Sequence, residues 1–427
     1  MKNIFSNEKN MRLSAEIQGL IDKLLIFVPE NISFFTFWCN NYMKNFLKKT
    51  GILLLVIVAG IMVFITFPSN FYLRKALWYT TPDIDDYRIF ENRAIKAENP
   101  QSWKISSVYN RKQIPDQILS HFKEYRTVAY LVVQDTAIVH EEYWDGYDAA
   151  SLSNSFSAAK SIVSLLAGIA RDEGKIKSFD QSVADYYPPF NTGNRKEITI
   201  RDLLTMSAGL NWDEAYSSPF SVTTKAYYGE NIESVVTDLQ LVELPGVRFR
   251  YQSGVTQLLS FVVANATGKS ISEYASEKLW TPVGAENDAL WSLDRKNGLE
   301  KAYCCFNSNA RDFARIGQLI LNKGNWNGVQ VVSEAFIDEA TQAASWLKDG
   351  DTEQNVDFYG YQWWHMKRNN MDVIYARGIL GQYIFVVPEK NMVVVRLGEK
   401  RSEVQTSGHY PQDVELWLDA AFDIVKE

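Results

Sequence analysis

The four residues Ser157-Ala-Ala-Lys160 stand at the start of a segment whose apolar residues predict a buried helix. Apolar side chains recur every three to four residues from Ile162 to Ala170, and Gly174 occupies a position typical of a helix C-cap. The same Ser-x-x-Lys spacing occurs three more times in the chain, but only here does a helical pattern follow directly. Ser157 and Lys160 would lie one turn apart at the positive end of the helix dipole.

A serine and a lysine in this position can form an activated nucleophile. A lysine that loses water shifts toward its neutral form and can then accept the proton of a neighbouring hydroxyl. The more common role of a serine at a helix start is that of an N-cap, and the more common state of a lysine is solvated. The choice between these interpretations depends on partners elsewhere in the chain.

The composition is that of a globular enzyme and excludes several other function classes. With 427 residues, 46% of them hydrophobic, the chain can bury a large core. The net charge of −7 is spread along the chain without a basic face, so we expect no nucleic-acid partner. The four histidines have no metal-ligand spacing, and Gly268-Lys-Ser lacks the first glycine of a phosphate loop. We therefore expect neither a metal nor a cofactor.

The cysteines do not predict a disulfide framework. They are Cys39, Cys304 and Cys305. Adjacent cysteines rarely bridge each other, because disulfide geometry is specific. We therefore expect no structural disulfides.

Residues 51–67 (GILLLVIVAGIMVFITF) carry no charge and predict a membrane-spanning helix. At ~1.5 Å per residue they reach about 25 Å, the short end of what a span needs. Basic residues at positions 44, 48 and 49 precede the segment, and Arg74 and Lys75 follow it. Because basic residues favour the cytoplasmic side, we expect residues 1–50 to form a cytoplasmic segment. The rest of the chain would lie outside the cytoplasmic membrane, in a periplasmic or extracellular position.

Two alternatives to this uncleaved single-pass anchor stay open. The segment could be a cleavable signal peptide, although residues 68–72 offer no small-x-small cleavage site. Met43 could also be the true start, because a basic and then an apolar stretch follow it. Beyond the anchor, prolines and dense charge over 68–125 predict a connector with limited structure, and residues 126–427 predict the folded domain.

Downstream segments predict a mixture of strands and helices. The patterns indicate a hairpin over 128–133 and 137–143, helices over 198–210, 255–266 and 412–426, and a polar turn with Tyr251 over 245–254. Gly268 would close the helix that follows the polar turn.

Several stretches, in this order, resemble the serine β-lactamase and penicillin-binding-protein family in its class C-like branch. They are SFSAAKS, ITIRDLLTMSAGL, PGVRFRYQSG, CCFNSNARDFARIGQLILNKGNWNG, YGYQWW and ARGILGQYIFVVPEKNMVVVRLG. The resemblance extends over residues 127–400. It implies a β-lactamase/transpeptidase-like α/β (α+β) fold, with an antiparallel sheet flanked by helices and a helical subdomain inserted near residues 180–300.

The resemblance also implies roles for particular residues. Ser157 would be the nucleophile that forms an acyl-enzyme, and Lys160 and Tyr251 would share the general-base work. A tyrosine has a pKa of about 10, so it can act as a base only beside a cation such as lysine. The backbone N–H groups of Ser157 and Ile379 would hold the oxyanion.

The third family motif departs from the family pattern, and this bears on the substrate. The motif aligns with Ala376-Arg377-Gly378, where only Gly378 agrees in type and would let a substrate lie close to the strand. Ala376 cannot hold a substrate carboxylate, and strand alternation predicts that Arg377 points away from the cleft. The resemblance therefore favours an esterase or amidase of small acyl or peptide substrates, similar to 6-aminohexanoate-oligomer hydrolases.

Further residues are expected to border the cleft without taking part in the chemistry. The expected substrate contacts are Ser253, Gly378, Tyr216, Asn307 and Trp364. Core packing is the stronger expectation for the tryptophan. Asp312 and Arg315 are expected to hold a helix start through capping and ion pairing.

Two other functions stay open from the sequence. One is a sensor or binding module that keeps a penicillin-binding-like fold without turnover. The other is a D-alanyl peptidase or β-lactamase that acts on peptidoglycan-type substrates. The sequence does not indicate an oligomeric state.

Overall fold

The computed structural model describes residue 19 and residues 32–67 and 70–426. The chain divides into two compact units, Met1–Phe71 and Tyr72–Glu427. In the first unit, helix α2 (Ile32–Phe64) contains most of the apolar segment expected over 51–67. Among the described residues, the stretch Asn40–Phe64 of this helix is the one with the length and composition needed to cross a membrane. Most of the expected cytoplasmic segment, residues 1–18 and 20–31, lies outside the described residues.

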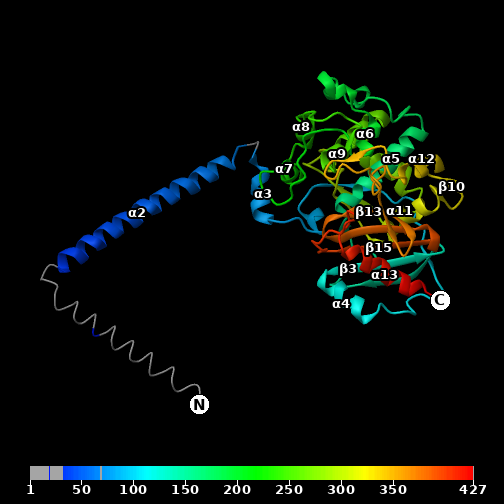
Figure 1. Cartoon of the computed structure of the whole chain (residues 1–427), viewed down its shortest axis with the longest axis horizontal. Helices are drawn as coiled ribbons and strands as arrows, with labels where there is room; N and C mark the ends of the chain where they lie inside the picture. The colour runs from blue at the N-terminus through cyan, green and yellow to red at the C-terminus, as the bar shows by residue number, and fades with distance from the viewer. Residues whose placement is uncertain (1–18, 20–31, 68–69, 427) are drawn as a thin grey trace, which may run out of the picture. The chain divides into compact units, whose positions relative to one another are not determined.

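A seven-stranded sheet forms the centre of the second unit (Figure 1). Its strands, in spatial order, are β12 (Trp364–Arg368), β13 (Met371–Gly378), β14 (Gln382–Val387), β15 (Met392–Gly398), β3 (Thr127–Gln134), β4 (Ala137–Tyr143) and β2 (Lys104–Ile105). Every neighbouring pair is antiparallel except β2 with β4. This confirms the expected antiparallel sheet, and β3 and β4 form the expected hairpin.

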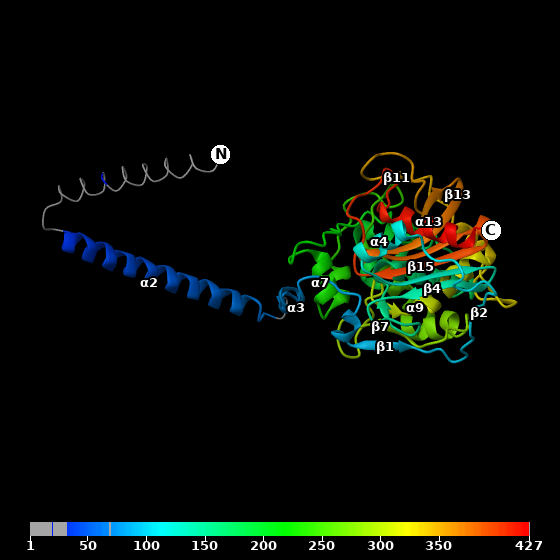
Figure 2. The same ribbon diagram turned by 90° about the horizontal axis from the view of Figure 1, so that it is seen from below.

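Helices cover both faces of this sheet, so its central strands are apolar on both sides. Helix α11 (Ala310–Leu321) lies on one face, and α4 (Asp116–Glu124) and α13 (Asp413–Val425) lie on the other (Figures 1 and 2). Trp417 of α13 anchors the second face, since its ring meets that of Phe122 at a centroid distance of 4.8 Å and its carbonyl accepts a hydrogen bond from Tyr130.

The helical region expected near residues 180–300 is present beside the sheet. It contains α6 (Ile200–Leu204), α7 (Val222–Tyr228), α8 (Ile232–Thr237), α9 (Ser253–Thr267) and α10 (Ile271–Ala275). Helix α9 ends at Gly268, which has the left-handed backbone conformation expected of a C-cap. Helix α6 is shorter than the expected 198–210, because Met206 adopts a positive φ of 57° that stops the helix.

The second unit contains further α-helices and strands. They are α3 (Tyr72–Tyr79), α5 (Ala159–Asp172), α12 (Glu334–Ala340), a four-stranded sheet of β1 (Asn92–Ile95), β7 (Ala289–Ser292), β8 (Phe306–Ser308) and β5 (Ser153–Asn154), and the pairs β9 (Asn325–Trp326) with β10 (Val329–Gln330) and β6 (Arg248–Phe249) with β11 (Lys348–Asp349).

Residues 72–125, expected to be a connector, are an integral part of this unit. Strand β1 pairs with β7, and β2 pairs with β4. Ile84, Ile95 and Trp103 are buried in the common core. The prolines and charges of this segment indicated a linker, but its scattered apolar residues find partners that are distant in sequence.

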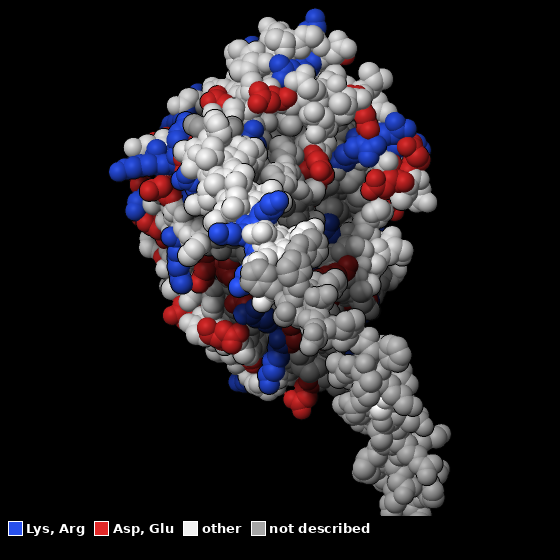
Figure 3. All heavy atoms as spheres, turned by 90° about the vertical axis from the view of Figure 1, so that its left-hand side faces the viewer, with Lys and Arg blue, Asp and Glu red and all other residues white. Residues whose placement is uncertain are grey.

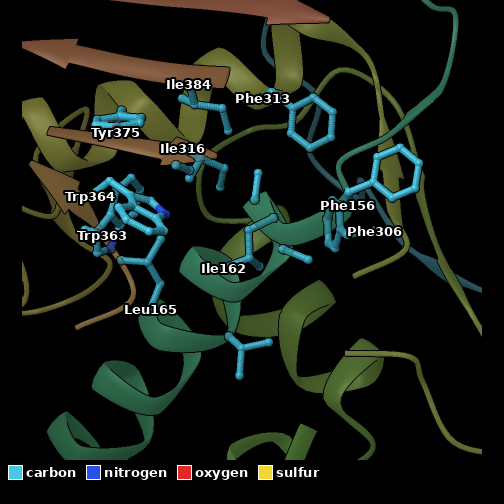
Figure 4. Close-up of a cluster of buried hydrophobic side chains, with 14 of the residues drawn as sticks. Phe156, Ile162, Leu165, Phe306, Phe313, Ile316, Trp363, Trp364, Tyr375 and Ile384 are labelled. Atoms are coloured by element: carbon cyan, nitrogen blue, oxygen red, sulfur yellow. The ribbon is translucent and has the colours of Figure 1, made fainter. Parts of the chain in front are cut away.

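Helix α5, which begins directly after Ser157, is buried between α9 and the sheet. Figure 4 shows Ile162 and Leu165 of α5 within a cluster that also holds Ile316 of α11 and Tyr375 and Ile384 of the sheet. The buried helix expected from the apolar periodicity is therefore confirmed.

Cys304 and Cys305 form a disulfide, which corrects the expectation that adjacent cysteines would not bridge. Neighbouring side chains point to opposite sides of an extended chain. Cys305 instead has a left-handed backbone with φ of 64°, so this alternation does not hold at the turn before β8.

Charges of both signs are interspersed on the face of the molecule drawn in Figure 3. This agrees with the mixed charge expected from the sequence, and it offers no single-sign field for a polyanion on that face.

The fully buried His140 on β4 should make the protein less stable in mild acid. Burial lowers the pKa of His140 to about 4, whereas the unfolded side chain has a pKa of about 6.5. Between pH 6.5 and about pH 4 the unfolded state therefore binds more protons than the folded state. The stability that neutral His140 contributes is lost as the pH falls through this window. From pH 7 to pH 5 this one group should remove about 2 kcal/mol from the free energy of unfolding.

Urea unfolding of the wild type and of His140→Phe, followed at both pH values, measures this loss. Burial raises the pKa of Asp86 to about 6, so this group stabilises the folded state as the pH falls. The effect of Asp86 on the free energy of unfolding is the same in both proteins and cancels in the comparison. An equal pH dependence in the two proteins would contradict the assignment to His140.

Candidate active site

Ser157 lies in a tight turn, the 3₁₀ helix η3 (Phe156–Ala158), directly before α5. Phe156 has a positive φ of 44°, an unusual conformation for a bulky residue. Two hydrogen bonds hold the turn, from the Phe156 N–H to the Asn154 side chain (2.9 Å) and from the Ser155 N–H to the Phe306 carbonyl (2.9 Å). Both partners belong to the four-stranded sheet or its edge, so Ser157 is presented from a rigid support.

Lys160 lies in the first turn of α5 with only 2% of its surface exposed. Its Nζ donates hydrogen bonds to Ser157 Oγ (2.8 Å) and to the backbone carbonyl of Tyr303 (3.0 Å). The same atom lies 5.0 Å from the ring centroid of Tyr251 and 5.6 Å from that of Tyr303. Ring faces and a carbonyl thus replace water around the ammonium group, without a carboxylate among these contacts.

Tyr251 lies in the short segment between β6 and α9. Its ring packs against Trp364 at a centroid distance of 5.5 Å and against the edge of Tyr359 at 6.2 Å. The structure therefore brings together Ser157, Lys160 and Tyr251, the three residues expected to carry the chemistry.

The two residues expected to supply the N–H groups of an oxyanion hole line one cavity. Ser157 and Ile379 both line it. Ser157 lies near the start of η3, and Ile379 is the first residue of another 3₁₀ helix, η8 (Ile379–Gly381). The first N–H groups of such a helix have no hydrogen-bond partner within it. Gly378 brings the end of β13 against η3, since a Cβ atom at that position would lie 2.2 Å from the Ser155 carbonyl oxygen. Glycine is therefore required there by packing.

Two of the expected substrate contacts, Ser253 and Tyr216, share one carboxylate. Glu214 accepts hydrogen bonds from the Ser253 N–H (2.6 Å), the Ser253 hydroxyl (2.5 Å) and the Tyr216 hydroxyl (2.5 Å). The family resemblance places Glu214 in a loop that borders the cleft, but it does not predict these contacts, because nothing in the local pattern indicates that this loop folds back onto the start of α9.

Asn307 and Arg377 lie elsewhere than expected. Asn307 is fully buried on β8, and its Nδ2 donates to Leu290, Ser292 and Cys305, so it holds the four-stranded sheet together. Arg377 does not point away from the cleft. Its guanidinium group lies 3.5 Å from the ring centroid of Trp364, and both line a cavity with Tyr251.

Residues of this site line two cavities of different chemistry. The first, of about 250 Å³, is lined by Ser157, Ile379 and mostly apolar or aromatic side chains. The second, of about 570 Å³, is lined by Tyr251, Trp364 and charged side chains of both signs. Ser253 and Tyr216 line the first cavity and their partner Glu214 lines the second, so this hydrogen-bonded group lies between the two.

The chain belongs to the Beta-lactamase family, whose sequence model matches residues 115–412. The 6-aminohexanoate-dimer hydrolase of Paenarthrobacter ureafaciens is 27% identical over 303 residues, which cover 67% of this chain and 75% of that protein. These findings confirm the family resemblance that the sequence motifs indicated.

Solved structures agree with this assignment. A Bacillus anthracis protein with the provisional name 6-aminohexanoate-dimer hydrolase superposes with a TM-score of 0.65 and 19% identity, over 80% of this chain and 93% of that one. A family VIII carboxylesterase superposes with a TM-score of 0.59 and 17% identity, over 76% of this chain and 99% of that one. At these identities the structures establish the shared β-lactamase-type fold.

Proposed function

We propose that this protein is a membrane-anchored serine hydrolase that cleaves an ester or amide bond through an acyl-enzyme on Ser157. The observation that carries the proposal is the 2.8 Å contact between Lys160 Nζ and Ser157 Oγ, made by a lysine that is almost completely buried. A nucleophile within hydrogen-bond reach of its base is the geometric signature of covalent catalysis.

In the acylation step, Ser157 Oγ attacks the substrate carbonyl carbon while its proton passes to the Lys160 and Tyr251 pair. The negative charge on the carbonyl oxygen is held by the N–H groups of Ser157 and Ile379. The tetrahedral intermediate then breaks the bond to the leaving group, which takes the proton. Because Lys160 Nζ lies 5.0 Å from the centre of the Tyr251 ring, we assign the transferred proton to the pair and not to either residue alone.

In the deacylation step, water attacks the ester formed on Ser157. The same pair removes a proton from this water, the same two N–H groups hold the oxyanion, and Ser157 regains its proton as the acid leaves. After both steps, Ser157, Lys160 and Tyr251 have the same bonds and protons as at the start of the cycle.

The substrate class that we propose is an ester or amide of a small acyl compound. Two similar proteins are named as a 6-aminohexanoate-dimer hydrolase and a carboxylesterase. Ala376 is fully buried and offers no cation to a substrate carboxylate, and the neighbouring Arg377 is engaged by the Trp364 ring and the His409 carbonyl. Both observations argue against β-lactams and terminal D-alanine groups as the main substrates.

Residues 40–64 of α2 have the length and composition of a membrane span. Lys44, Lys48 and Lys49 lie in its N-terminal part, and the C-terminal part has no charge. The excess of basic residues on the N-terminal side supports an arrangement with the catalytic unit outside the cytoplasmic membrane.

The proposed function is tested by measuring the intact mass of the full-length protein after mixing with p-nitrophenyl acetate. We expect a mass increase of one acetyl group together with release of p-nitrophenol, and neither in Ser157→Ala. A folded wild-type protein that shows no adduct and no turnover would overturn the hydrolase and favour a binding module.

A further inference from the structure

The helix that follows the proposed membrane span forms part of the wall of the apolar cavity. Ala76 and Leu77 of α3 line the cavity together with Ser157 and Ile379. Helix α3 packs against α7, whose Tyr227 and Tyr228 line the same cavity. The cavity beside Ser157 is thus closed by a segment near the start of the second unit.

The interior of this cavity suits a hydrocarbon group. Its wall includes Phe156, Pro82 and the disulfide-bonded Cys304, and none of the described residues that line it is charged. Apolar pockets bind apolar ligand groups because burial removes their surface from water. By contrast, Asp349, Arg250 and Arg377 are among the residues that line the second cavity.

The reaction geometry assigns the two halves of a substrate to the two cavities. Ser157 and Ile379, whose N–H groups form the proposed oxyanion hole, both line the apolar cavity. Tyr251, which with Lys160 must return a proton to the leaving group, lines the polar cavity. The acyl part therefore extends into the apolar cavity, and the leaving group departs through the polar one.

The outer surface of α3 indicates where such a substrate comes from. Leu77 is 57% exposed and Trp78 is 80% exposed, which is unfavourable for adjacent large apolar residues in water. Tyr72, the first residue of α3, comes only eight residues after Phe64, the last residue of α2. Aromatic side chains that closely follow a span in the sequence are typical of the membrane interface.

We infer that the apolar cavity binds the aliphatic acyl chain of an amphiphilic ester or amide that enters from the membrane to which the protein is anchored. This inference rests on the proposed function and defines its substrate class. Leu77 contacts the acyl chain of the substrate at the cavity wall and selects for it. Its neighbour Trp78 is not among the residues that line the cavity.

The inference is tested with full-length protein in phosphatidylcholine nanodiscs and p-nitrophenyl esters of two, four, six and eight acyl carbons. We expect kcat/KM to rise by roughly threefold to fourfold per methylene until the cavity is full. Leu77→Asp should lower the ratio of hexanoate to acetate kcat/KM by at least fivefold. The matched control Leu244→Asp introduces the same charge at a similarly exposed leucine that lines neither cavity, and it should leave this ratio unchanged.

A second experiment tests whether the acyl substrate enters from the membrane. We expect p-nitrophenyl hexadecanoate to be cleaved faster when it is carried in the protein's own nanodisc than in separate protein-free vesicles. Equal rates would overturn entry from the membrane.

The outcomes separate this inference from the function on which it rests. Ser157-dependent cleavage of the acetate with no gain for longer chains, or equal ratios in the two Asp variants, would overturn the acyl cavity and keep the hydrolase. Absence of Ser157-dependent cleavage of every ester would overturn the hydrolase itself.

Discussion

Replacing Lys160 with Met should lower kcat/KM for an activated ester by at least about 10³-fold while leaving the protein folded. The Nζ atom of Lys160 lies 2.8 Å from Ser157 Oγ, so its removal leaves the serine without the base in direct contact with it. Methionine keeps a similar length and needs no hydrogen-bond partner. Because an apolar side chain replaces an almost fully buried amine, thermal stability should stay equal or increase.

Lys175→Met is the matched control, because this lysine is exposed and lies just beyond the end of the same helix. It should retain full activity. The double variant Ser157→Ala/Lys160→Met should be no worse than Ser157→Ala alone, since both residues act in the same step. A Lys160→Met protein that is folded and retains more than a tenth of wild-type activity would contradict the role of Lys160 as base.

The parts of the fold and site that follow from sequence are those set by local periodicity. Ser157 and Lys160 are three residues apart, so one turn of helix is enough to bring them together. The β3–β4 hairpin and the C-cap of α9 at Gly268 also depend on neighbouring residues only. Tyr251 needed the family resemblance, because its approach to Lys160 is a long-range contact that no local pattern encodes.

The parts that sequence did not predict depend on distant partners or on side-chain length. Strand β1 pairs Asn92 with Ser292, and such a pairing leaves no local signal in either segment. The alternation of a strand fixes the Cβ direction of Arg377, but a long flexible side chain can still reach Trp364 at the cleft. The contribution of α3 to the apolar cavity was not predicted because α3 lies far from the other lining residues in the sequence.

Replacing Asp312 with Ala should destabilise the protein by about 3–5 kcal/mol. Asp312 is fully buried at the start of α11, and its carboxylate accepts hydrogen bonds from the Glu286 N–H (2.7 Å), the Asn287 N–H (3.0 Å) and the Asn309 side chain (2.8 Å). It also pairs with Arg315 Nε at 3.1 Å, a guanidinium that is 1% exposed. The substitution leaves several buried donors without an acceptor and a buried cation without its closest counter-charge.

The sequence indicated a helix start held by capping and ion pairing, and the structure adds that Asp312 links α11 to the chain before β7. Removing Asp312 should therefore destabilise the protein more than removing an exposed carboxylate. Asp338→Ala, which removes the ion pair with Lys323 at a half-exposed site, should cost at most about 1 kcal/mol. Urea unfolding followed by tryptophan fluorescence gives both values.

A double-mutant cycle separates the ion pair from the helix cap. Asp312→Ala/Arg315→Met should be more stable than the sum of the single effects predicts, because removing both partners leaves no uncompensated charge. Additive losses would mean that Asp312 acts through the backbone donors at residues 286 and 287 alone. In that case the Arg315 side chain would be held by its contacts to Trp103 and Trp326, whose ring centroids lie 5.0 and 5.4 Å away.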